Sequence, residues 1–144
     1  MPITKRGWQN ALRNAYFSGD AHRIEKAVAH GAKIDGLFYV AALAGNLEMV
    51  KAFANSIDIS KLENSTEIMD AAIRNGRAFG NFSMAEFLAT KGFKPGKEML
   101  GELKETVEKS SELKRIEVQK ASERIDRERD MIMGLLRKMD KNSN

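Results

Sequence analysis

The chain has 144 residues, enough for one domain and an appendage on a prior of roughly 100–200 residues per domain. Apolar residues make up 42% of the chain and charged residues 31%, which excludes collagen-like and broadly disordered chains. Cysteine is absent, which excludes disulfides, thiolate metal sites and cysteine nucleophiles, and the net charge of +4 is too small to indicate nucleic-acid binding by itself.

Two features of the sequence bear on where the protein is located. No apolar stretch approaches the roughly 18 residues of a membrane span, so we expect no transmembrane helix. Residues 1–10 lack the long apolar middle of a signal peptide, and the absence of cysteine argues against a disulfide-stapled secreted protein. We therefore expect an intracellular, cytoplasmic protein.

Three segments of the chain share one pattern, at residues 15–35, 41–53 and 71–93. Each begins as a short helix with alanines, passes through a glycine turn and continues into a second helix with an apolar stripe. The turn glycines are expected at Gly19, Gly45 and Gly76, because glycine adopts the left-handed conformation that closes a helix. No single unit can bury its apolar face alone, so we expect the three to stack into a short all-α solenoid.

Two of these segments carry the residues of a known repeat. Residues 30–35 are His-Gly-Ala-Lys-Ile-Asp, and residues 41–51 are Ala-Ala-Leu-Ala-Gly-Asn-Leu-Glu-Met-Val-Lys. Residues 8–94 therefore resemble the ankyrin repeat family, as about three divergent repeats. The resemblance implies a solenoid of helix-turn-helix repeats that binds other proteins. Only Gly36 separates Asp35 from Leu37, which leaves no room for a β-hairpin finger between the first two repeats, so the helical groove is the expected binding surface.

The composition changes at residues 92–96, Gly-Phe-Lys-Pro-Gly, which predicts a repeat domain over 1–95 and a helical segment over 96–144. From Lys97 to Met139 only Gly101 and Gly134 disfavour a helix, so we expect one long amphipathic helix, about 60 Å in length, with a frayed tail. Heptad spacing predicts an apolar seam that suits a coiled coil. The seam residues are Val118, Ala121, Ile125, Ile132, Leu135 and Met139.

Residues that could carry chemistry are scarce. His22 and His30 are the only histidines and lie eight residues apart, so we expect no multi-histidine zinc site and no metal or cofactor. No nucleophile elbow, phosphate-binding glycine loop or His-Glu-x-x-His motif occurs, so we expect no enzyme activity. In residues 112–129 basic and acidic side chains alternate, which is typical of a solvated helix and argues against nucleic-acid binding.

One feature departs from the ankyrin pattern. The position two residues after the first alanine is usually polar in that family because it faces the concave groove, but here it is Phe17, Leu43 or Ile73. An apolar groove indicates a surface for an external amphipathic helix, or one covered by the chain's own C-terminal helix. The alternative is that the repeat frame is shifted and these are core residues. The candidate groove residues are Asn14, Phe17, Ser18, Val40, Leu43, Met69, Asp70, Ile73 and Arg74.

These patterns predict a non-catalytic protein–protein interaction module. Its groove would bind a segment of another protein, and its C-terminal helix would form a homodimer or dock a second protein. An alternative is a bacterial or viral effector that targets host proteins through the ankyrin-like surface and acts in the host cell. A lesser alternative is nucleic-acid binding through the C-terminal helix, which predicts a steep salt dependence of binding.

Overall fold

The computed structural model describes the backbone of residues 3–115 and 122–141, and their side chains except at 113–115 and 122–125. This part of the chain contains eight α-helices, one short 3-10 helix and no strand, which confirms the predicted all-α class. The helices are α1 (Lys5–Ser18), α2 (Ala21–Ala29), α3 (Asp35–Ala44), α4 (Leu47–Ser56), η1 (Ile59–Lys61), α5 (Ser65–Phe79), α6 (Ser83–Thr90), α7 (Lys97–Arg115) and α8 (Ser122–Lys141).

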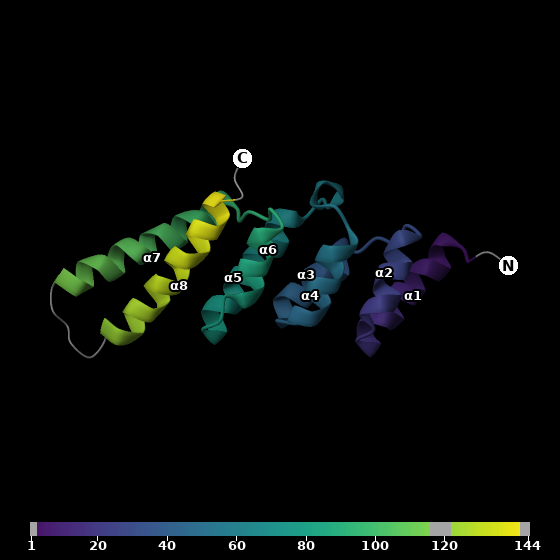
Figure 1. The fold of residues 1–144 in the computed structure, drawn as a ribbon, viewed down its shortest axis with the longest axis horizontal. Helices are drawn as coiled ribbons and strands as arrows, with labels where there is room; N and C mark the ends of the chain where they lie inside the picture. Colours follow the sequence, from purple (N-terminus) through teal and green to yellow (C-terminus); the bar gives the residue numbers. More distant parts are fainter. Residues whose placement is uncertain (1–2, 116–121, 142–144) are drawn as a thin grey trace.

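The helices lie in a row of pairs that follows the order of the chain (Figure 1). Within each pair the two helices pack on each other, as α1 with α2, α3 with α4, α5 with α6 and α7 with α8. Neighbouring pairs are joined by contacts of α2 with α4, α4 with α6, α6 with α8 and α3 with α5. Each pair therefore buries apolar surface on its neighbour, and one continuous hydrophobic cluster spans all four pairs.

Local backbone chemistry defines the turns of the first three pairs. Each turn has a left-handed glycine, followed by an Asp or Asn whose side chain accepts a hydrogen bond from a backbone N–H of the next helix. The N–H of that Asp or Asn donates to the carbonyl five residues earlier, at 2.9–3.0 Å, and so satisfies a carbonyl at the end of the preceding helix. The three turns are Gly19-Asp20, Gly45-Asn46 and Gly80-Asn81, with glycine φ angles of 70°, 72° and 67°.

The third turn lies about one helical turn later than the sequence pattern predicts. Helix α5 continues through Gly76 and is capped by Gly80, so the prediction of a turn at Gly76 is wrong. Gly76 is buried against the ring of Phe82. Its carbonyl accepts the hydrogen bond from the N–H of Asn81, as the carbonyls of Ala15 and Ala41 accept those of the first two turns. The repeat frame of the third pair is therefore shifted toward the C-terminus.

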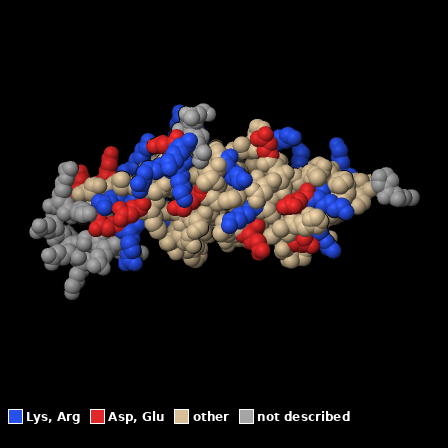
Figure 2. All heavy atoms as spheres, viewed as in Figure 1, with Lys and Arg blue, Asp and Glu red and all other residues tan. Residues whose placement is uncertain are grey.

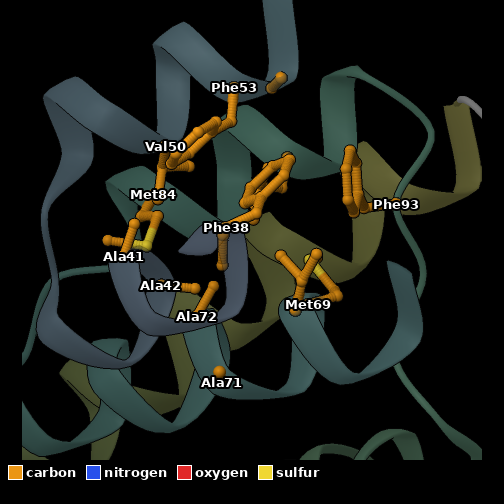
Figure 3. Close-up of a cluster of buried hydrophobic side chains, with 14 of the residues drawn as sticks. Phe38, Ala41, Ala42, Val50, Phe53, Met69, Ala71, Ala72, Met84 and Phe93 are labelled. Atoms are coloured by element: carbon orange, nitrogen blue, oxygen red, sulfur yellow. The ribbon is translucent and has the colours of Figure 1, made fainter. Parts of the chain in front are cut away.

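Aromatic rings and small residues form the core between the pairs (Figure 3). Phe38 of α3 lies between Phe53 of α4 and Phe93, with ring centroids at 5.4 Å and 5.6 Å. Ala42 and Ala72 are also buried, and such small side chains allow α3 and α5 to approach closely. The alanines that recur in the sequence therefore serve helix packing.

The C-terminal segment is not the single long helix that the sequence pattern predicts. It forms α7 and α8, which pack on each other, and α8 also packs on α6 (Figure 1). A single helix would hold Met139 about 60 Å from Lys97. Instead, Met139 lines a hollow of about 340 Å³ together with Lys94 and Pro95, close to where α7 begins. The segment therefore returns toward the repeats.

The predicted coiled-coil seam closes within the chain, as far as its residues are described. Ile132 and Leu135 are fully buried, and Met139 is nearly so. Val118 and Ala121 lie outside the described residues, as does the side chain of Ile125. The apolar face of α8 thus finds its partner on α6 and α7, and the prediction that Ile132, Leu135 and Met139 form a seam with a second copy is wrong.

Candidate interaction surface

Four large apolar side chains are exposed on α1, α3 and α5. Phe17 is 75% exposed, Val40 46%, Leu43 47% and Phe79 79%. All four lie in the C-terminal halves of these helices, which end at the lower edge of the row in Figure 1. We call these four residues the apolar strip. Because exposed apolar side chains normally occur singly, a group of four on successive helix pairs indicates a binding surface.

The helical register points the strip away from the core. Leu12 of α1 and Phe38 of α3 are fully buried, and Phe17 and Leu43 each lie five residues further along the same helix. Five residues turn a helix by about 500°, so the exposed side chains point about 140° away from the buried ones. An amphipathic helix usually carries polar residues in that direction, and here it carries apolar ones.

Neighbouring side chains set the spacing of the helices that carry the strip. The ring of Tyr16 packs edge-on against Phe17, with centroids 5.5 Å apart, and stacks on the buried ring of Phe53 at 6.0 Å. The side chain of Asn75 in α5 donates a hydrogen bond of 3.4 Å to the carbonyl of Leu43 in α3. The first and third of these helices are thereby tied to the second pair.

Phe79 lies between two hollows. One, of about 230 Å³, extends toward the turn at Gly45. The other, of about 410 Å³, extends toward α8, where Arg77 donates two hydrogen bonds to one carboxylate oxygen of Glu128, at 2.9 Å and 3.1 Å. Both sides of this ring are therefore open to an incoming side chain.

The structure divides the predicted groove residues into two groups. The exposed group is Asn14, Phe17, Ser18, Val40, Leu43 and Arg74. Met69 and Ile73 are fully buried in α5, so their prediction as groove residues is wrong, and the alternative of a shifted frame holds for the third repeat. Ile73 has the register of Phe38, a core residue. Asp70 is half-buried, and its carboxylate accepts a hydrogen bond of 2.9 Å from the backbone N–H of Gly96.

The sequence pattern did not indicate Phe79 as a surface residue. The signal that could have found it is the Gly80-Asn81 step, which repeats Gly19-Asp20 and Gly45-Asn46. Aligning the third repeat on this step, and not on its alanine pair, places Phe79 at the last residue of a first helix. Phe79 then has the position of Ala44 in the second repeat, one residue after the position of Leu43.

The C-terminal helices leave the strip open. They continue the row beyond α6 (Figure 1), and among the described residues α8 borders the strip beside Phe79. The alternative in which the C-terminal helix covers the groove is therefore wrong for the described residues of α7 and α8. Phe17 and Leu43 keep their exposure with both helices in place.

A further hollow, of about 660 Å³, lies at the opposite edge, between the ends of α2 and α4. Charges of both signs line it, among them Lys33, Lys61, Asp58 and Glu63. The backbone N–H of Ser60 donates a hydrogen bond of 3.1 Å to Asp58, and this bond lowers the pKa of the carboxyl. Balanced charges select a ligand of neither sign, so we assign this hollow no function.

Within the described residues, no three His, Asp or Glu side chains are grouped as ligands of one metal ion. His30 stacks on Trp8, with ring centroids 3.9 Å apart, and its Nδ1 lies 2.8 Å from the carbonyl of Lys26. Both contacts belong to the packing of α1 and α2. No helix in the described part of the chain is both long and apolar enough to span a membrane.

No protein-family model matches the chain, and comparison with curated proteins and with solved structures finds no match. The arrangement of the described residues is therefore the basis for assigning a function. Among the features above, the apolar strip points most directly to a ligand, because it leaves several large apolar side chains in water.

Proposed function

We propose that this protein is a non-catalytic protein-interaction module that binds a segment of another protein along the apolar strip. The observation that carries the proposal is the exposure of Phe17, Leu43 and Phe79 on three successive helix pairs. Full burial of one such side chain contributes about 1.5–3 kcal/mol relative to its exposure in water. A partner segment that covers the strip would therefore be stabilised in the complex by removing these side chains from water.

In this proposal the module is a divergent member of the ankyrin type. The ankyrin-like residues of the first two repeats and the row of helix pairs in Figure 1 support this assignment. The strip then lies on the side lined by α1, α3 and α5, which corresponds to the groove side of such repeats. The α7–α8 pair serves as the terminal cap, because a row of repeats needs a final unit that covers its last apolar face, and α8 packs on α6.

In this proposal the described seam residues of α8 have no part in self-association. Ile132 and Leu135 already lie in the chain's own core, so they are not available to a second copy. The proposed complex therefore contains one chain and one partner segment.

A displayed peptide library tests the proposal. The full chain and a Phe17→Ser/Leu43→Ser variant are used as parallel baits. The matched control is Ile3→Ser/Met133→Ser, which removes two other apolar side chains, 52% and 42% exposed, that lie outside the strip. Urea unfolding of each variant separates loss of binding from loss of fold.

We expect a set of peptides that binds the wild type and the control but not the strip variant. The proposal is overturned if the same peptides bind all three baits equally, or if no peptide is enriched on the wild type. Either result would mean that the exposed apolar side chains of α1 and α3 do not form a docking surface.

A further inference from the structure

The helices that carry the strip have no carboxylate near it. Helix α1 contains none, and α3 and α5 contain them only in their first halves. Asp35 accepts a hydrogen bond of 3.0 Å from the N–H of Glu63, and Asp70 accepts one of 2.9 Å from the N–H of Gly96. Glu67 lies in the first turn of α5, at the edge opposite the strip. The surface around the strip therefore lacks negative charge from these three helices.

Two exposed arginines have a register that places them on the face of the row that carries Phe17 and Leu43. Arg13 is four residues before Phe17, one helical turn away on the same face of α1. Arg74 has the same register in α5, because each arginine lies six residues before the glycine that ends its helix. Both are exposed, and neither forms an ion pair with a described residue. The strip is thus flanked by cations that have no counter-ion in the described chain.

The second helix of each pair has a different charge pattern. Helices α2 and α4 carry charges of both signs, which Figure 2 shows spread along the row, whereas Glu86 is the one charged residue of α6. Two carboxylates at or in these helices are paired. Asp20 pairs with Arg23 at 3.3 Å, and Glu86 pairs with Lys138 at 2.8 Å. Glu48, in the first turn of α4, lies near the same edge as the strip and has no described ion pair. One unpaired carboxylate against two unpaired arginines still leaves an excess of positive charge at this edge.

The spacing of the helix pairs matches the periodicity of a bound helix. Packed helices lie about 8–10 Å apart, and side chains seven residues apart on one helix are separated by about 10.5 Å along its axis. Because α3 and α5 pack directly, a helix that lies across them can place one apolar side chain beside Leu43 and another beside Phe79. Helix α1 is joined to the second pair through Tyr16 on Phe53, and it presents Phe17 to the next part of the bound helix. The flanks of the bound helix would then lie beside the two arginines.

We infer that the segment bound along the apolar strip is an acidic amphipathic helix of another protein. This inference rests on the proposed function and adds the chemistry of the partner. Apolar side chains two turns apart pack on the strip, and glutamates or aspartates on the flanks meet Arg13 and Arg74. A nucleic acid is the competing polyanion, and the exposed rings of Phe17 and Phe79 suit base stacking. Val40 and Leu43 are aliphatic and suit the apolar face of a helix, and two arginines are few for a backbone of phosphates.

Two synthetic helical peptides with the same apolar face test the sign of the charge. One peptide carries glutamate at its polar positions and the other carries lysine, and the binding of each to the full chain is measured by fluorescence anisotropy at low salt. We expect the glutamate peptide to bind about tenfold more tightly than the lysine peptide. We also expect its affinity to fall as the salt concentration is raised to about 0.5 M, because the ion pairs at the rim are exposed to solvent.

Charge variants locate the effect on the surface. Arg13→Gln/Arg74→Gln removes the two cations beside the strip, and Lys26→Gln/Lys33→Gln removes two exposed cations elsewhere as the matched control. We expect the arginine variant to bind the glutamate peptide about fivefold more weakly, and the control to stay within about twofold of the wild type. Phe17→Ser/Leu43→Ser is expected to bind neither peptide.

The outcomes separate this inference from the proposed function. Equal binding of both peptides, lost in Phe17→Ser/Leu43→Ser, overturns the inference and leaves the proposed function standing. A glutamate peptide that binds regardless of the strip substitution contradicts both. If neither peptide binds but the library yields strip-dependent sequences, only the inference fails. A single-stranded oligonucleotide that binds more tightly than the glutamate peptide, and depends on Arg13 and Arg74, would assign the surface to nucleic acid.

Discussion

Replacing Gly76 by alanine tests how closely α5 and α6 pack at the third turn. Gly76 is buried inside α5 and has no left-handed backbone angle, so its lack of a side chain serves packing alone. An added Cβ would lie 2.7 Å from Cε1 of Phe82, closer still to Cδ1 of the same ring, and 3.0 Å from the carbonyl oxygen of Asn81. Phe82 is 3% exposed, so its ring has no open space to move into.

Two effects of opposite sign determine the magnitude. Alanine is favoured over glycine inside a helix by about 0.8–1 kcal/mol, whereas an extra carbon in a filled core costs about 1–3 kcal/mol. The steric cost is expected to be near the upper end, because two ring atoms and a backbone oxygen are all too close. We therefore expect Gly76→Ala to lower the free energy of unfolding by about 1–2 kcal/mol net, and Tm by roughly 3–6 °C.

Thermal and urea unfolding, followed by far-UV circular dichroism, measures this change. Gly101→Ala in α7 and Gly134→Ala in α8 are matched controls, because an added Cβ meets nothing within 4 Å at either position. Each control is expected to raise the free energy of unfolding by about 0.5–1 kcal/mol. Phe82→Leu is expected to recover part of the Gly76→Ala cost in a double-mutant cycle. A Gly76→Ala protein as stable as either control would refute the reasoning.

Three further substitutions test the packing. Leu135→Ala is expected to lower the free energy of unfolding by about 2–5 kcal/mol at every protein concentration, because Leu135 is buried within one chain. A wild-type unfolding midpoint that rises with protein concentration would instead support a dimer through this seam. Ile73→Ala is expected to cost a similar amount in urea unfolding, whereas Leu43→Ala, at a side chain 47% exposed, stays within about 0.5 kcal/mol; equal costs would contradict the shifted frame. Glu128→Gln removes the ion pair of 2.9 Å with Arg77 and is expected to cost less than about 1 kcal/mol in low salt, with the difference vanishing in high salt; a loss that salt leaves unchanged would point to another cause.

The sequence was sufficient to predict the first two helix pairs. At Gly19-Asp20 and Gly45-Asn46, the glycine ends one helix and the next side chain caps the following one, so all the groups involved are within a few residues of each other. Phe17 and Leu43 were placed on the surface by the same local frame, and both are exposed. The binding role of these two residues stays a prediction.

The third repeat could not be placed from the same pattern. Two glycines, Gly76 and Gly80, lie within one helical turn of each other, and an alanine pair at 71–72 resembles the pair at 41–42. The two glycines differ in their surroundings: the ring of Phe82 packs against Gly76, whereas Gly80 has the left-handed backbone angle of the turn. That contact is part of the packing of α6 on α5. With the shifted frame, Met69 and Ile73 are core residues and not the groove residues that the sequence pattern predicts.

The sequence by itself determined that the chain is helical, where the first two turns lie and which faces of the helices are apolar. Capping, glycine conformation and helical periodicity act between residues close together in the chain, so they can be read from the sequence. Only the tertiary structure decided which apolar face meets which. Ile132 and Leu135 could have packed on a second copy, and they pack on α6 and α7 of their own chain. Phe17 and Leu43 stay exposed, although Phe17 contacts Tyr16 beside it in α1. The hydrophobic effect is not directional, and any partner that removes apolar surface from water stabilises the buried face. Periodicity in the sequence therefore shows which face is apolar but not which element covers it.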